Sequence, residues 1–346
     1  MSRRPLLGLF VVFVAAACAR DVERLDEVQQ MAYGVKPAVV RISAFATAQF
    51  RYAPQAIAEV EKLLAASGRD LPAREKPSSE TALDTGAGGS GSGFIIHPDG
   101  WILTSGHVVA PTRDAKSLEA ELLRNGAIAA LVKHFQVAAL RALYKDEELD
   151  RYINVLARSA RLANVKVVNE VELSNGDKMP FRIDRWTPSL ASGGTDLALI
   201  RVARRNLPAL ALGEAEATRV GESIWSVGYP AVASSSDDVI GGWLSRDSDL
   251  EATFNPGTIT AIKSDVTNMP VFQSNVAIYR GNSGGPAVNR AGQVIGISSW
   301  GHTNAEQIKF LVPIDVAKKL LAEAKVPANA DGEFNQNYRA ALDAAH

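Results

Sequence analysis

Gly281-Asn282-Ser283-Gly284-Gly285-Pro286 is the stretch that decides the fold, because two upstream residues give its serine a chemical meaning. His107 closes the apolar run that begins at Trp101, and Asp196 opens a later apolar run that ends at Val202. A serine hydroxyl is a weak nucleophile at neutral pH and needs an adjacent base, for which an imidazole with a pKa of about 6.5 is suited. We therefore expect Ser283 to be a nucleophile, His107 its general base and acid, and Asp196 the carboxylate that orients the imidazole.

The glycines around Ser283 suit the negative charge that develops on a carbonyl oxygen when a nucleophile attacks it. A turn without side chains presents its backbone N–H groups to a single point. We predict an oxyanion hole at Gly281, Asn282 and Ser283, with the N–H groups of Gly281 and Ser283 as its donors.

The order His107, Asp196, Ser283 resembles that of the chymotrypsin-type serine proteases. This resemblance implies a mainly β, chymotrypsin-like fold of two six-stranded β-barrels. The pattern Gly-x-Ser-x-Gly at 281–285 also fits the nucleophile elbow of α/β-hydrolases, whose Asp and His follow the serine. Too little chain follows Ser283 for that fold. The pattern of the residues after Ser283 is typical of two strands, a helix and a tail. A Gly-rich turn without chemistry is the plain alternative for the hexapeptide taken alone.

A wider similarity joins the chain to the HtrA/Deg (high-temperature-requirement) proteases over about residues 28–325. It is carried by Gly91-Ser92-Gly93-Phe94-Ile95-Ile96 before His107 and by Gly292-Gln293-Val294-Ile295-Gly296-Ile297 after Ser283. Ser105-Gly106 depart from the family, which usually has alanine or asparagine before its histidine, but both residues are small. Family members typically carry PDZ domains after the protease domain. Residue 346 comes too soon for one, so we expect a protease domain without PDZ domains. Relatives often form trimers, so a homo-oligomer is a further expectation.

The same protease architecture implies a specificity pocket. The residue six positions before the nucleophile lies at the base of the primary pocket, and here it is Ala277. A small neutral residue pairs with no buried cation. Ser299, Trp300 and Gly301 are expected to form the pocket wall that binds the substrate backbone by strand addition. The resemblance thus implies cleavage after small or medium aliphatic residues such as Val, Ala or Ile.

Composition narrows the function classes. The chain has 346 residues, of which 47% are hydrophobic and 22% charged, so it is an ordinary globular chain with ample core. Its net charge of −1 and the lack of a basic stripe disfavour nucleic-acid binding. No His or Cys cluster has metal-ligand spacing, so we expect neither a metal nor another cofactor. A single cysteine allows no internal disulfide.

The N-terminus has the pattern of an export signal. Arg3 and Arg4 precede an apolar core from Leu6 to Ala17 that is too short to span a bilayer comfortably. Small residues then lead to Cys18, as in a bacterial lipobox. We expect residues 1–18 to be a signal peptide that exports the protein to the bacterial periplasm or cell envelope. We also expect Cys18 to be lipidated, which would anchor the protein to a membrane there. Ordinary signal cleavage nearby stays the alternative.

The remaining sequence predicts the following organisation. Residues 19–85 hold an N-terminal helix, the first strand and a long loop, and residues 86–204 the first β-barrel, with a Gly/Ser run at 86–93 feeding a strand. The second β-barrel covers 205–314, and 315–346 form a helix capped by Asp315 and a tail. Helical periodicity predicts a three-helix insertion at about 114–163, broken at Asn125-Gly126. We expect its apolar stripe to pack on the barrel or between its own helices. The sharper hypothesis is partner binding or gating, for which the insertion would cover or border the cleft.

These observations together predict a serine endopeptidase that hydrolyses peptide bonds in polypeptide substrates. The family resemblance implies a role in envelope protein quality control, on unfolded or misfolded proteins. The alternative is a non-catalytic binding or chaperone-like protein on the same fold. The complete set of His107, Asp196 and Ser283, together with the Gly-rich turn, argues against it.

Overall fold

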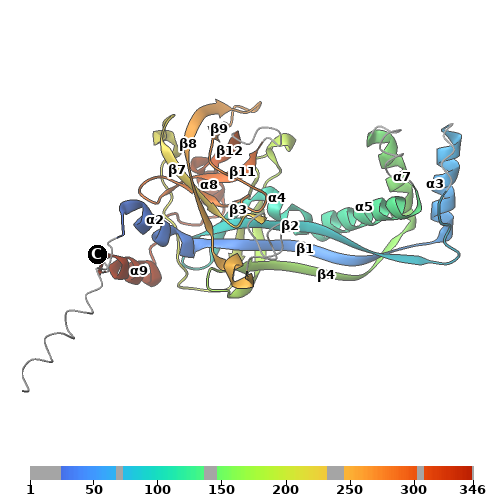
Figure 1. Ribbon diagram of the computed structural model, residues 1–346, viewed down its shortest axis with the longest axis horizontal. Coiled ribbons are helices and arrows are strands. Elements are labelled where there is room, and N and C mark those ends of the chain that lie inside the picture. Colours follow the sequence, from blue (N-terminus) through green and yellow to red (C-terminus); the bar gives the residue numbers. More distant parts are fainter. Residues whose placement is uncertain (1–24, 68–72, 136–145, 232–244, 302–307, 345–346) are drawn as a thin grey trace, which may run out of the picture.

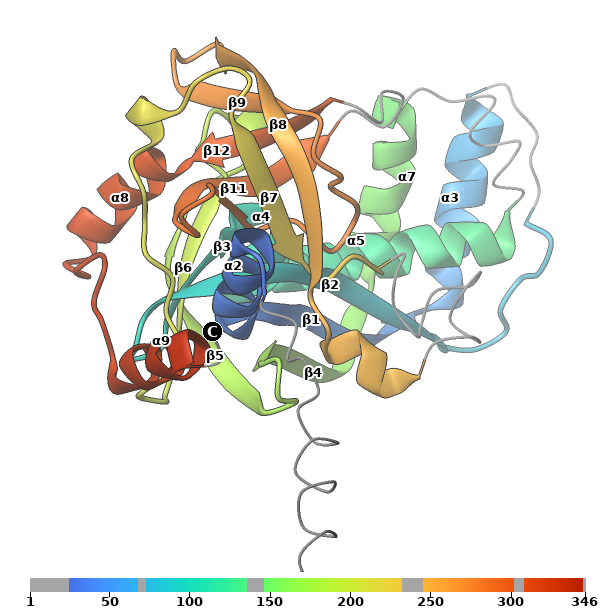
Figure 2. The ribbon, with the colours of Figure 1, turned by 60° about the vertical axis from the view of Figure 1, so that its left-hand side comes forward.

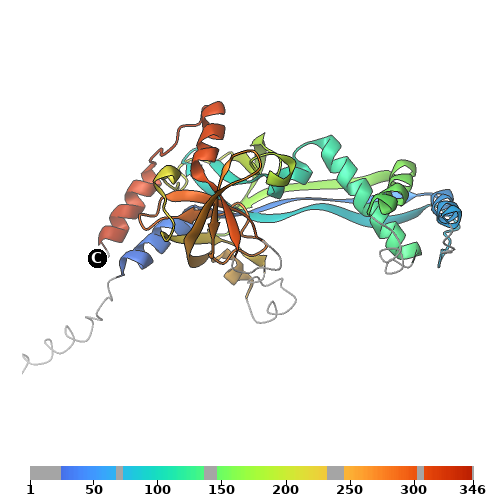
Figure 3. The same ribbon diagram turned by 90° about the horizontal axis from the view of Figure 1, so that it is seen from above.

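Two closed β-barrels lie at one end of the molecule, and a long β-sheet arm carries helices at the other (Figure 1). The computed structural model describes residues 25–67, 73–135, 146–231, 245–301 and 308–344. Figure 2 shows the barrels in front with the arm helices behind them, and Figure 3 shows the arm running out from the barrels. The fold is therefore the expected mainly β pair of six-stranded barrels, with an extension that the sequence indicated only in part.

The first barrel closes in the order β1-β2-β3-β6-β5-β4, with antiparallel neighbours throughout. Its strands are β1 (Val39–Tyr52), β2 (Thr81–His97), β3 (Trp101–Ser105), β4 (Arg161–Glu172), β5 (Lys178–Trp186) and β6 (Leu197–Val202). The second barrel closes in the order β10-β11-β12-β9-β8-β7. Its strands are β7 (Ser223–Gly228), β8 (Thr253–Ser264), β9 (Pro270–Ser274), β10 (Pro286–Val288), β11 (Val294–Gly301) and β12 (Lys309–Pro313).

Strand β6 shows why the two barrels stay together. Successive side chains of a strand point to opposite faces. Ala198 and Ile200 are fully buried in the core of the first barrel, whereas Leu197 and Leu199 belong to a cluster that they share with the second barrel. Both faces of β6 are therefore buried, which explains its uninterrupted apolar sequence. The strand begins one residue after Asp196, so the candidate carboxylate lies between the barrels.

The helices complete the chain. They are α2 (Glu27–Val35), α3 (Pro54–Ala66), α4 (Gly106–Val109), α5 (Ala115–His134), α7 (Asp146–Ser159), α8 (Ile314–Glu323) and α9 (Glu333–Ala344). Asp26 caps α2 by accepting hydrogen bonds from the backbone of Val28 and Gln29. In the part of the chain that the structure describes, no helix is both long and apolar enough to cross a membrane.

The arm arises because β1 and β2, with 14 and 17 residues, are longer than the barrel requires. They stay paired as far as Tyr52 and Thr81, and β4 follows β1 along its other edge. The buried face of β1 carries only alanines near the barrel, and Leu118 and Leu122 of α5 pack on them. Farther out, Phe50 and Tyr52 form a separate core with α3, α5 and α7, the three arm helices.

The insertion differs from its prediction in two ways. Helix α5 runs without interruption through Asn125-Gly126, so this pair does not break the helix. Gly126 instead lets the helix lie close to the ring of Phe50, where a Cβ would overlap it. The arm helices also come from two segments of the chain, since α3 precedes residue 86 and lies outside the predicted insertion, in a stretch where the sequence also indicates a helix over residues 56–66. Residues 136–145 between α5 and α7 lie outside the described residues. Whether the insertion borders the cleft stays a prediction.

Other boundaries also move. The apolar stretch at 35–42 resembles the first strand of the family's protease domain, but β1 begins only at Val39, because Val35 still belongs to α2. The Gly/Ser run at 86–93 is part of β2, not a feeder to it, and is held by continuous pairing with β1. Asp315 is not the cap of α8: it lies in the first turn, where its side chain binds Lys318 and the backbone of Glu216. Cys18 and the predicted signal peptide lie outside the described residues.

Candidate active site

Strand pairing brings His107 and Asp196 together. Ser105 at the end of β3 pairs with Leu197 at the start of β6, so the residues that continue each strand meet at the same edge. The backbone N–H of Gly106 donates to the carbonyl of Asp196 at 2.9 Å. The backbone N–H of His107 donates to Asp196 Oδ1, also at 2.9 Å. These two bonds, both donated by backbone N–H groups, join the two segments without the imidazole ring of His107.

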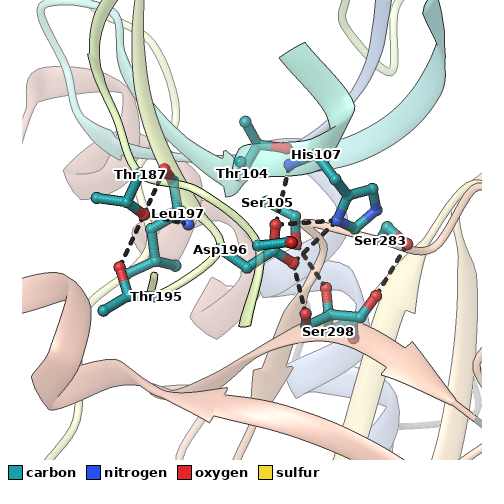
Figure 4. Close-up of polar contacts among 12 residues, drawn as sticks. Thr104, Ser105, His107, Thr187, Thr195, Asp196, Leu197, Ser283 and Ser298 are labelled. Atoms are coloured by element: carbon teal, nitrogen blue, oxygen red, sulfur yellow. Dashed lines mark hydrogen bonds and ion pairs between the residues drawn. The ribbon is translucent and has the colours of Figure 1, made fainter. Parts of the chain in front are cut away.

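The His107 ring binds the carboxylate. Its Nδ1 lies 2.9 Å from Oδ2 and 3.1 Å from Oδ1 of Asp196 (Figure 4). A carboxylate only accepts, so Nδ1 carries the proton and Nε2 of the neutral ring keeps its lone pair. The side chain of His107 is 42% exposed, while that of Asp196 is 3% exposed. The histidine ring is therefore accessible from solvent, and its partner is shielded from water.

Asp196 is held by neighbours from both barrels. Ser299 Oγ, on β11, donates to Asp196 Oδ2 at 2.6 Å. The backbone of Asp196 has a φ of 53°, a left-handed conformation that Asp and Asn tolerate better than most residues. Two threonines stabilise this turn, because Thr187 Oγ1 lies 2.8 Å from Thr195 Oγ1 and also accepts from the backbone N–H of Leu197. The carboxylate is thereby fixed in one orientation toward the ring.

Ser283 lies between Gly281 and Gly284, which have φ values of 99° and 86°. Figure 4 shows the His107 ring beside Ser283, with the edge that carries Nε2 toward the serine. Ser283 Oγ donates to the carbonyl of Ser299 at 3.2 Å, and within the described ranges no hydrogen bond joins it to His107. Catalytic hydrogen bonds are often unformed in unliganded enzymes, and rotation of the serine hydroxymethyl group is required to form this one.

The oxyanion turn has two N–H groups available. The carbonyl of Arg280 accepts from the N–H of Ala231 at 2.8 Å. In a trans peptide the N–H points away from the carbonyl, so the N–H of Gly281 faces the opposite side of this unit, away from Ala231. Among described residues neither this N–H nor that of Ser283 has an acceptor. Asn282 is the middle residue of this turn, and its own N–H donates to the carbonyl of Tyr279 at 2.9 Å, which leaves Gly281 and Ser283 as the expected donors.

The predicted pocket residues come from β11, which holds Ser299, Trp300 and Gly301, and from the segment after β9, which holds Ala277. Ala277 is half-buried, and its carbonyl accepts from the side-chain amide of Asn255 at 3.3 Å. Trp300 and Gly301 end β11 and pair with β12, while the Trp300 side chain lies outside the description. Ser299, expected at the pocket wall, also turns out to bind the carboxylate through its hydroxyl. No sequence signal could identify this bond, because the two residues are 103 positions apart.

The site contains further supports that the sequence did not indicate. Trp186 Nε1 donates to the carbonyl of Gly106 at 2.8 Å, and Ser105 Oγ donates to the carbonyl of Ser298 at 3.0 Å. These bonds fix the segment before His107 to both barrels. Across the described residues, no three His, Cys, Asp or Glu side chains gather into a metal-binding group. The arrangement suits proton transfer from a serine to a histidine and stabilisation of a nearby anion.

Comparison with known proteins points to one family. The family model described as "Trypsin-like peptidase domain" matches residues 91–297. A protein of Halomonas elongata named "Probable periplasmic serine endoprotease DegP-like" is 27% identical over 331 residues, which cover 90% of this chain and 52% of that protein. A protein of the same name from Hahella chejuensis is 28% identical over 242 residues, covering 68% of this chain and 35% of the other. The chain thus spans about half or less of the length of these relatives.

Solved structures give a weaker match. The structure titled "HtrA-type protease AlgW with decapeptide" aligns with a TM-score of 0.46 at 17% identity, covering 86% of this chain and 67% of the other. A serine endoprotease from Yersinia pestis aligns with a TM-score of 0.44 at 19% identity, covering 86% and 66% of the two chains.

Proposed function

Because this chain belongs to the family of trypsin-like peptidases, we propose that it is a serine endopeptidase with His107, Asp196 and Ser283 as its catalytic triad. The observation that carries the proposal is the buried Asp196 bound to Nδ1 of His107, with Ser283 beside the ring. The three residues come from distant parts of the chain and meet where the barrels join. A site of this kind fits the chemistry of nucleophilic acyl transfer.

The proposed mechanism follows from the positions of these groups. Nε2 of His107 takes the proton of Ser283 as its Oγ forms a bond to the substrate carbonyl carbon. Asp196 holds the ring through Nδ1 and stabilises the imidazolium. The N–H groups of Gly281 and Ser283 receive the oxyanion. His107 then gives its proton to the leaving amine as the peptide bond breaks, and water releases the acyl group from Ser283 by the same steps.

The substrate and location are proposed on less direct support. Relatives that match this chain carry the name of a periplasmic serine endoprotease, and the N-terminus has the pattern of an export signal. We propose that the protein acts in the periplasm or cell envelope, on unfolded or misfolded polypeptides. A non-catalytic binding protein on the same fold is disfavoured, because such a protein has no need of an imidazole held by a buried carboxylate.

Specificity is proposed from Ala277. A cationic substrate side chain that reached this residue would lose water without gaining a counter-charge from it. We propose cleavage after small or medium aliphatic residues, with Ser299, Trp300 and Gly301 pairing with the substrate backbone. Mass spectrometry of the products from a denatured protein is the test. A majority of cuts after Lys or Arg would exclude this assignment of the pocket.

Membrane attachment is proposed through lipidation at Cys18. Lipidation would place the protein in the detergent phase of bacterial membranes, since one acyl chain contributes roughly 0.8 kcal/mol for each buried methylene. Cys18→Ser should release or mislocalise it. Equal partitioning of both forms would indicate ordinary signal cleavage. Assembly into a homo-oligomer is proposed only by analogy with relatives, and analytical ultracentrifugation of the purified protein tests it.

The decisive experiment replaces the nucleophile. Ser283→Ala should lose cleavage of unfolded casein and labelling by a fluorophosphonate, while the thermal unfolding midpoint stays the same within error. Ser274→Ala is the matched control, because Ser274 is fully buried in the second barrel and its hydroxyl has no partner among the described residues. It should keep full activity. Substantial casein cleavage by Ser283→Ala would mean that another residue is the nucleophile.

A further inference from the structure

Ser92, on β2, is fully buried and contacts the oxyanion turn through two different groups. Its side-chain Oγ lies 2.7 Å from the carbonyl oxygen of Gly281, and its backbone N–H donates to the carbonyl of Ser283 at 2.8 Å. Both residues that supply the oxyanion N–H groups are therefore fixed to one serine of the first barrel. The rest of the turn belongs to the second barrel, so these bonds cross from one barrel to the other.

The direction of the Oγ hydrogen bond is determined by a third contact. The backbone N–H of Tyr229 donates to Ser92 Oγ at 2.9 Å, so the oxygen acts as acceptor there. Its hydroxyl proton is then directed to the carbonyl of Gly281, which accepts no other hydrogen bond among the described residues. The carbonyl of Ser92 accepts from Thr104 Oγ1 at 2.7 Å, so every polar group of Ser92 has a partner. An alanine at this position could not replace the bond to Gly281.

Gly281 needs such an anchor because its backbone is intrinsically free. Its φ is 99°, and glycine adopts positive and negative φ about equally well. A Cβ at this position would lie 2.4 Å from the carbonyl oxygen of Tyr229, so a stiffer residue does not fit. The peptide before Gly281 is held by Ala231, and the peptide after it by Ser92. If the Ser92 bond is lost, the carbonyl of Gly281 has no partner among the described residues, and the peptide after Gly281 keeps only the bond from the N–H of Asn282 to the carbonyl of Tyr279. The backbone of Gly281 is then less restricted on the side that faces Ser283.

Asn282 shows that this conformation has a cost. Its side chain is fully buried, and neither Oδ1 nor Nδ2 has a hydrogen-bond partner among the described residues. A buried polar atom without a partner is destabilising, so the turn favours other conformations unless it is held. The bonds from Ser92 to the residues on either side of Asn282 offset this tendency.

We propose that Ser92 is a positioning residue that holds the turn Gly281–Ser283 in the conformation that donates two N–H groups to the oxyanion. The proposal rests on the proposed function and adds to it a residue that never touches the substrate. Because β2 continues into the arm, the same bonds connect the arm sheet to the catalytic turn.

The test compares Ser92→Ala with the wild-type protein and with Thr85→Val. Thr85 is a matched control: it lies on the same strand, is buried, and donates its hydroxyl to the carbonyl of Leu122, far along the arm. Turnover of a fluorogenic peptide is measured per site titrated with a fluorophosphonate. Losing an oxyanion donor costs about 100- to 1,000-fold in kcat, and losing its support should cost part of that, about 10- to 100-fold. KM should change by less than about threefold, because the ground-state contacts remain.

A peptide boronic acid supplies a second readout, because its tetrahedral adduct places an oxygen in the oxyanion hole. Its dissociation constant should rise in Ser92→Ala by about the factor that kcat falls, and stay unchanged in Thr85→Val. If kcat per titrated site stays within twofold of wild type, or if KM and kcat change together as in a partly unfolded protein, the positioning role is wrong. Should Ser92→Ala fail to fold, Ser92→Cys with its weaker donor gives the same comparison, with an intermediate loss of kcat. A wild-type protein that is folded but turns over no peptide would refute the proposed function itself.

Discussion

Gly126→Ala is predicted to destabilise the arm, although alanine is the better helix former. Gly126 lies inside α5, and a Cβ there would be 2.3 Å from Cγ and 2.6 Å from Cβ of Phe50. The ring of Phe50 is fully buried and lies 5.5 Å from that of Tyr52. Because the overlap reaches the root of the side chain, rotation of the ring cannot relieve it, and the helix must move away from the sheet.

Two opposing effects decide the sign. Replacing glycine by alanine within a helix contributes about 1 kcal/mol in favour of the folded state. Overpacking a filled core costs about 1–3 kcal/mol, and an overlap this close belongs at the upper end of that range. The net result is a destabilisation of about 1–2 kcal/mol, which is confined to the arm because Phe50 belongs to the core of the arm helices.

Hydrogen exchange of the α5 amides, followed by mass spectrometry, measures this local effect. A destabilisation of about 1.4 kcal/mol should speed exchange about tenfold in α5 and leave the barrel strands unchanged. Gly34→Ala is the control: Gly34 lies in α2 and a Cβ there meets nothing within 4 Å, so this substitution should slow exchange in its own helix. If Gly126→Ala slows exchange in α5 in the same way, the close approach of the helix to Phe50 is not what requires glycine.

Three further predictions follow from the same contacts. Asp196→Asn keeps a residue type that tolerates the φ of 53°, but its amide NH2 cannot accept the hydrogen bonds that the carboxylate accepts from His107 and Ser299. The value of kcat should fall by about 10⁴-fold, as in a comparable triad. A fall of less than about tenfold would remove Asp196 from the mechanism. Tyr52→Phe leaves Nε2 of buried His134 without its partner at 2.7 Å, which should cost about 1–3 kcal/mol in arm stability with peptide turnover unchanged. Burial raises the pKa of Tyr52 above 10.0, so its contribution to stability is complete below pH 10 and is lost as the pH rises through the raised pKa. Faster α5 exchange above pH 10 in wild type but not in Tyr52→Phe would show this. A protein with Gly/Ser linkers in place of residues 53–80 and 113–160 should cleave small peptides normally but folded proteins at an altered rate, and equal rates on both would exclude a gating role for the arm helices.

The sequence by itself predicted the barrel fold and the residues of the candidate site. Short-range patterns are sufficient for this, because an apolar run that leads to His107, a strand that begins after Asp196 and a Gly-rich turn around Ser283 are each visible within about ten residues. Their order along the chain then selects among the folds that use a serine, a histidine and an aspartate. Helical periodicity likewise located most of the arm helices.

Only the tertiary structure decided which polar groups hold the site in place. Ser92 and Gly281 are 189 residues apart, and Ser299 and Asp196 are 103 apart, so each bond exists only because the two barrels are packed together. The arm was hidden for a similar reason. A Gly/Ser-rich stretch has the local pattern of a linker, and it becomes part of β2 only because β1 pairs with it along its whole length. Gly126 resembles a helix breaker until Phe50, from another part of the chain, fills the space beside it.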